Sequence, residues 1–104
     1  MEAKIILGRI LQRLIDQGYA QVAGYNRFGF VALEKNSITV SRENGEDTPL
    51  PFSRILKCIV LYQEHPELYD QGPNALRPFG VTHLDSPLFA LLHLMEPKAY
   101  ESLT

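Results

Sequence analysis

Tryptophan is absent from this sequence, and cysteine occurs only once, at Cys58. A single cysteine excludes a disulfide within the chain, so we expect a reducing compartment, the cytoplasm. A long apolar run is also missing from the amino-terminal segment 1–18, which carries charged side chains among its apolar ones. Neither a signal peptide nor a membrane span is therefore expected, and no membrane association is predicted.

The chain also lacks an excess of either charge. It has 10 basic and 12 acidic residues, a formal net charge of -2, and the two signs alternate along the sequence. Binding to duplex DNA usually requires a dense basic surface, so duplex DNA is not an expected partner. What the chain does have is an ordinary globular composition, with 45% hydrophobic and 21% charged residues. This composition predicts one folded domain over residues 1–104 without a structural disulfide or metal.

Hydrophobic periodicity predicts an α+β fold. Apolar residues recur at helical spacing over 2–17, and Gly18 follows where a glycine can close a helix. Aromatic and β-branched residues then predict a three-stranded antiparallel meander. Its strands are expected at approximately 19–25, 28–34 and 37–42. The polar, proline-containing segment 42–51 is expected to form an exposed loop.

The second half of the chain is predicted to be mainly helical. Ser53 is expected to cap a helix that continues to about Glu64, since a residue before proline, here His65, leaves the helical region. The glycine- and proline-rich segment 67–87 predicts a structured loop, within which Val81–Leu84 is expected to form a short strand. These helices are expected to pack on one face of the sheet.

Two further helical segments are predicted near the carboxyl end. Asp85 is expected to cap a helix with Pro87 at its first position, and this helix extends to about Met95. Because it is apolar on nearly every face, it is expected either to be buried or to form a contact surface. A last helical turn is predicted near Pro97. Its packing side chains are expected to be Ala99, Tyr100 and Leu103.

The loop before that helix combines rigid backbone residues with polar side chains, a mixture typical of a shaped recognition loop. The alternative is a connection that only packs over the core. On the recognition hypothesis, the candidate partner-binding residues in the loop and the helix are Asn74, Arg77, His83, Asp85 and Phe89.

The segment Asn26–Leu33 resembles the ribonucleoprotein motif of RNA-recognition and cold-shock domains around its Phe-Gly-Phe-Val core. Here Asn26 and Arg27 replace the usual basic and glycine residues, and Leu33 replaces the last aromatic. The resemblance implies that strand aromatics stack on nucleobases. The alternative is that both rings pack against a helix. The nucleic-acid-binding residues would be Arg27, Phe28 and Phe30, with Lys35 and Arg42 at phosphates.

Catalytic and metal-binding patterns are weak in this sequence. Cys58 lies in an apolar helical run, where burial keeps a thiol protonated. Ser86, Asp85 and His83 are residue types of a nucleophilic site, but their order is better explained by helix capping. His83 with Asp85 supplies too few ligands for zinc, so we expect hydrogen-bonded structural histidines, no metal and no cofactor.

These observations favour a non-enzymatic recognition or regulatory module. We expect it to act through a protein partner or as a homodimer, in preference to nucleic acid. Single-stranded nucleic-acid binding is the alternative, and it requires Phe28 and Phe30 to be exposed on the sheet. A small hydrolase or transferase is a third possibility, which requires His83 to contact a carboxylate within a pocket.

Overall fold

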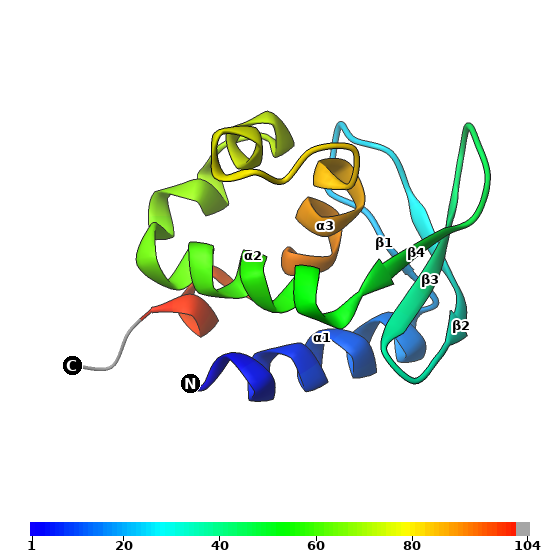
Figure 1. Cartoon of the computed structure of the whole chain (residues 1–104), viewed down its shortest axis with the longest axis horizontal. Helices are drawn as coiled ribbons and strands as arrows, with labels where there is room; N and C mark the ends of the chain where they lie inside the picture. The colour runs from blue at the N-terminus through cyan, green and yellow to red at the C-terminus, as the bar shows by residue number, and fades with distance from the viewer. Residues whose placement is uncertain (102–104) are drawn as a thin grey trace.

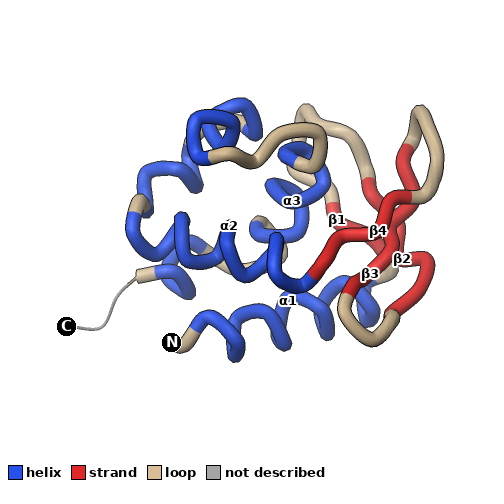
Figure 2. Tube along the Cα trace, viewed as in Figure 1, coloured by secondary structure: helices blue, strands red, loops and turns tan. Residues whose placement is uncertain are grey.

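The computed structural model describes residues 1–101 and confirms the small α+β fold. The sheet lies at one end of the molecule, while α1 and α2 run beside each other away from it (Figure 1; Figure 2). The α-helices are α1 (Ala3–Gln17), α2 (Phe52–Glu64) and α3 (Asp85–Leu92). The strands are β1 (Tyr19–Ala20), β2 (Phe28–Leu33), β3 (Ser37–Arg42) and β4 (Thr48–Pro51). Short 3-10 helices are η1 (Pro66–Asp70), η2 (Pro73–Phe79) and η3 (Pro97–Tyr100). None of the helices described is both long and apolar enough to cross a membrane.

Helix α1 forms where its apolar periodicity predicts it. Ile6, Ile10 and Leu14 are fully buried along one face, because residues three and four apart share a side of the helix. Gly18 closes the helix in the left-handed conformation, with φ of 87°, and its N–H donates to the Leu14 carbonyl at 2.8 Å.

The sheet is antiparallel, with strand order β1-β2-β3-β4. The central pair β2 and β3 is in register from Phe28 opposite Arg42 to Leu33 opposite Ile38, with an irregularity between Phe30 and Ala32. The expected first strand at 19–25 is too long, since only Tyr19 and Ala20 pair with β2. The chain then turns at Gly24, whose φ of 88° does not fit a strand.

The fourth strand corrects the prediction of an exposed loop over 42–51. Thr48–Pro51 pairs with β3, and Leu50 within it is fully buried. Two prolines predict a loop because proline cannot donate to a ladder, but a strand at the edge of a sheet needs donors on one side only. Of the expected loop, only residues 43–47 lie outside the sheet, because Arg42 ends β3 and Thr48 begins β4.

Helix α2 begins two residues earlier than a Ser53 cap would place it, at Phe52, and follows β4 directly. Pro51 occupies the capping position and Ser53 lies inside the first turn, so the predicted serine cap is wrong. The strand expected at Val81–Leu84 is also absent: Val81 is buried without strand pairing, and it directly follows Gly80, which caps η2 with φ of 87°.

Helix α3 is the centre of the helical layer and not a contact surface. Phe89, Leu92 and Met95 are only 3%, 0% and 2% exposed, so the apolar face is already covered by this chain. The helix begins at Asp85 and ends at Leu92, with Leu84 at the capping position. Asp85 is therefore not the cap, and the predicted extension to Met95 is a turn beyond the helix.

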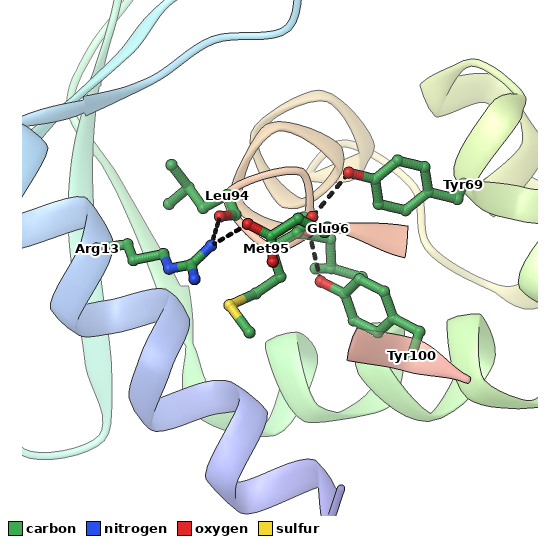
Figure 3. Close-up of polar contacts among 7 residues, drawn as sticks. Arg13, Tyr69, Leu94, Met95, Glu96 and Tyr100 are labelled. Carbon is green, nitrogen blue, oxygen red and sulfur yellow. Dashed lines mark hydrogen bonds and ion pairs between the residues drawn. The ribbon is translucent and has the colours of Figure 1, made fainter. Parts of the chain in front are cut away.

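Side chains from three other elements donate hydrogen bonds to backbone carbonyls at and just beyond the carboxyl end of α3 (Figure 3). Arg13 of α1 donates to the Leu94 carbonyl at 2.6 Å, and the Tyr69 hydroxyl of η1 donates to the Met95 carbonyl at 2.7 Å. Tyr100 of η3 donates to Leu92. The carbonyls at and just beyond a helix end lack intrahelical partners, and these side chains supply donors there; the Leu92 carbonyl also accepts from the Met95 N–H at 3.3 Å. Of the predicted final packing residues, Tyr100 is buried and Leu103 lies outside the described residues.

Candidate functional site

Three of the sequence-predicted partner-binding residues meet at the amino end of α3. Arg77 from η2, together with His83 and Asp85, lines an open cleft of about 490 Å³. We call this the arginine cleft. Its full lining is Arg42, Arg77, Thr82, His83, Asp85 and Ser86.

Arg77 and Asp85 form an ion pair at one wall of the arginine cleft. The Arg77 Nε atom lies 3.2 Å from Asp85 Oδ2. The Asp85 side chain is only 8% exposed, whereas that of Arg77 is 61% exposed. A carboxylate taken out of water needs a hydrogen-bonded counter-charge, and Arg77 supplies it while its remaining donors lie toward solvent.

Arg42 also lines the cleft and is held by neutral groups. Its Nε atom donates to Thr48 Oγ1 at 2.8 Å, and its Nη2 atom donates to the His83 carbonyl at 3.3 Å. Within residues 1–101, no ion pair joins Arg42 to a carboxylate. A guanidinium has five N–H donors in a fixed fork, so Arg42 is oriented by its protein contacts and retains positive charge for a ligand.

The turn at His83 contacts Arg42 and lies two residues before Asp85. His83 has φ of 64°, and the Leu84 N–H donates to the Thr82 carbonyl at 2.7 Å. This hydrogen bond closes a three-residue turn on His83, and positive φ makes it the rare, strained form of γ-turn. A residue held in such a conformation costs about 1–3 kcal/mol, and such residues concentrate at binding and catalytic sites. The strained turn presents its carbonyl to Arg42 and its side chain to the cleft.

The other two predicted partner-binding residues lie elsewhere. Asn74 is exposed on η2 and is not part of the cleft lining. Phe89 forms the floor of a smaller pocket of about 150 Å³, which shares Ser86 with the arginine cleft. We call this the aromatic pocket. Its lining residues are Gly24, Tyr25, Asn26, Phe28, Pro73, Ser86 and Phe89.

The residues of the nucleic-acid hypothesis are not arranged for base stacking. Phe28 is 2% exposed and Phe30 packs partly buried against the core. The Arg27 guanidinium lies 3.9 Å from the centre of the Tyr19 ring, and its backbone N–H donates to Glu43. Phe28 and Phe30 therefore lack the exposed ring faces that a platform for nucleobases requires.

His83, Asp85 and Ser86 line the same cleft, but in the described residues they are not linked to one another as a catalytic or metal-binding group. Burial raises the pKa of the Cys58 thiol to about 12, so this cysteine is protonated at neutral pH, as its apolar run predicts. His93 is a structural histidine, with ring nitrogens 2.8 Å from the Phe89 and Tyr69 carbonyl oxygens. No hydrogen bond or ion pair links His83 to a carboxylate in the part of the chain that the structure describes. In the same part, no three His, Cys, Asp or Glu side chains group closely enough to hold a metal.

Sequence reasoning selected Arg77, His83 and Asp85 from the composition of one loop, but it assigned Arg42 to a different hypothesis. No local pattern marks Arg42 as their neighbour, because the contact between Arg42 and His83 spans 41 residues. Comparisons with protein families, with curated proteins and with solved structures found no match to this chain. Function is therefore inferred from the geometry of the chain itself.

Proposed function

We propose that this protein is a non-enzymatic recognition module that binds an acidic group of a partner protein in the arginine cleft. The observation that carries the proposal is Arg42, a guanidinium anchored by Thr48 and by the His83 carbonyl, without a carboxylate partner in the described chain. Arginine at such a position recognises carboxylate or phosphate through paired, charge-assisted hydrogen bonds.

The surrounding groups support an anionic ligand. Arg77 faces the same cleft, and Asp85 neutralises only one of the two arginines. The Thr82 and Ser86 hydroxyls add neutral groups that can donate to an oxyanion. Asp85 is withdrawn from the solvent and paired, so it is a poor candidate for a catalytic base. Recognition therefore agrees better with this chemistry than catalysis does.

A protein partner is favoured by the shape of the site. The cleft is broad and open, which suits a side chain on another surface better than an enclosed metabolite. A reducing location, the cytoplasm, agrees with the single buried thiol. A second copy of the chain is an alternative partner, and a mass that rises with protein concentration in sedimentation would support it.

Binding of short acidic peptides tests the proposal directly. We expect acetyl-Gly-phosphoserine-Gly-amide to bind the ¹⁵N-labelled protein with a Kd on the order of 1 mM, since a few charge-assisted hydrogen bonds support about 4 kcal/mol. The corresponding aspartate peptide should bind more weakly. NMR titration should show shifts at Thr82, His83 and Ser86, which line the cleft.

Matched arginine variants provide the control. Arg42→Met should reduce affinity at least about tenfold, because it removes the charge that the ligand neutralises. Arg54→Met removes an exposed arginine on α2 that does not line the cleft, and should leave affinity unchanged. If neither peptide shifts the cleft signals, or if both variants weaken binding equally, the proposed function is wrong.

A further inference from the structure

We infer that the acidic group recognised in the arginine cleft is accompanied by an adjacent apolar side chain, which occupies the aromatic pocket. This inference rests on the proposed function and specifies its ligand. The ligand is then a segment of a partner protein that carries an aspartate, glutamate or phosphorylated residue next to a compact apolar residue.

The two cavities are contiguous. Ser86 lines both of them, and the Arg42 guanidinium lies 6.0 Å from the centre of the Phe28 ring in the aromatic pocket. Consecutive Cα atoms in a polypeptide are about 3.8 Å apart, so neighbouring side chains can reach both places. A peptide that places its charge against Arg42 and bends at that residue can therefore bring the next side chain to the mouth of the aromatic pocket, whereas in a fully extended peptide the two side chains point to opposite sides.

The volume of the aromatic pocket sets the size of its occupant. At about 150 Å³, it equals the apolar cavity that is known to accept one benzene molecule. Its floor consists of the buried rings of Phe28 and Phe89, and Pro73 adds a further apolar wall. A leucine side chain or a small ring matches these dimensions and can contact the apolar part of the lining, Phe28, Pro73 and Phe89.

Tyr25 forms the exposed rim of this pocket. Its side chain is held against Phe89 with ring centres 5.4 Å apart at 62°, an edge-to-face contact, yet the residue is 45% exposed. Its hydroxyl approaches Gly72, where an added Cβ would lie 3.0 Å from the oxygen. Tyr25 is therefore a large, positioned aromatic group at the edge of a cleft, the type of residue that dominates binding at many interfaces.

The test compares peptides that differ only in the apolar residue. Acetyl-Leu-phosphoserine-Leu-amide should bind at least about tenfold more tightly than acetyl-Gly-phosphoserine-Gly-amide, because it buries one additional apolar side chain. The corresponding aspartate peptides should show the same preference at lower affinity, and these arms distinguish a phosphate from a carboxylate source. Leucine peptides alone should shift the backbone signals of Gly24 and Asn26.

Variants at Tyr25 identify the pocket as the source of the preference. Tyr25→Ala should abolish the leucine advantage without changing the affinity for the glycine peptides, and Tyr25→Phe should retain it because the ring remains. Equal affinity for leucine and glycine peptides, with both bound in the arginine cleft, would overturn this inference and leave the proposed function intact. Absence of binding by every peptide would overturn both.

Discussion

The two ends of α3 are built in opposite ways. At the carboxyl end, side chains from α1, η1 and η3 each donate to a carbonyl in or just beyond the helix (Figure 3). At the amino end, no side chain of the described residues forms a capping hydrogen bond, and a strained turn opens onto the arginine cleft. Satisfied polar groups stabilise a fold, whereas strain and unpaired charge reduce stability and are retained where a ligand uses them.

Alkaline pH should have the largest effect on stability, and it should act mainly through buried phenols near the carboxyl end of α3. Burial raises the pKa of the Tyr62 and Tyr100 phenols above their usual value of 10.0. Both groups therefore favour the folded state fully below pH 10, and this stability is lost as the pH rises further, because the unfolded chain releases protons first. The free energy of unfolding should fall by roughly 3 kcal/mol per pH unit above pH 10, since each group contributes about 1.4.

Urea unfolding from pH 8 to pH 12 measures this slope. Burial of Cys58 should add to the loss from about pH 9, because its pKa is raised from 9.0 to about 12. Tyr62→Phe should reduce this slope by about 1.4 kcal/mol per pH unit, which is the contribution of one phenol. A stability that stays constant between pH 9 and pH 11 would contradict the burial of these groups.

A matched pair of tyrosine variants gives the next largest effect. Tyr100→Phe should destabilise the protein by about 1.5 kcal/mol, because the Leu92 carbonyl loses a buried hydroxyl donor and keeps only the longer bond from the Met95 N–H at 3.3 Å. Among residues 1–101, the buried Tyr62 hydroxyl has no hydrogen-bond partner, so Tyr62→Phe should be neutral or stabilising. Thermal or urea unfolding of both variants provides the measurement. Equal losses would show that the Tyr100 hydrogen bond does not stabilise the carboxyl end.

Arg13→Met tests whether the carboxyl end of α3 affects ligand binding at its amino end. The variant removes a charged donor from the Leu94 carbonyl and should cost about 1 kcal/mol, since the Arg13 side chain is 43% exposed. Peptide binding at the amino end should not change, because Arg13 does not line either cavity of the proposed site. A parallel loss of peptide affinity would mean that the carboxyl end also positions the arginine cleft.

Features that depend on neighbouring residues could be predicted from the sequence, and features that depend on long-range contacts could not. Helix α1 and the β2–β3 pair follow from local periodicity, and Arg77, His83 and Asp85 stand out in a loop of unusual composition. Strand β4 could not be predicted because its prolines argue locally for a loop, and only pairing with β3 decides otherwise.

Burial of α3 and the position of Arg42 depend on the whole fold. A helix that is apolar on all sides can be a core element or a contact surface, and packing of this chain around Phe89 decides between them. Arg42 meets His83 only after the sheet and the helical layer have come together. Properties that arise from such long-range contacts leave no periodic signal in the sequence.

The smallest expected effect concerns the strain at His83. His83→Gly should stabilise the protein by about 1 kcal/mol, because glycine adopts positive φ without the steric cost that a side chain imposes. The same change removes the imidazole from the cleft and loosens the turn whose carbonyl orients Arg42, so affinity for the phosphoserine peptide should decrease several-fold. His83→Asn provides the control, since asparagine tolerates this backbone conformation better than most residues and keeps a polar side chain. If the glycine variant gains stability and binds as well as the parent chain, then the strained turn does not serve the site, and the contrast between the ends of α3 reduces to one of capping alone.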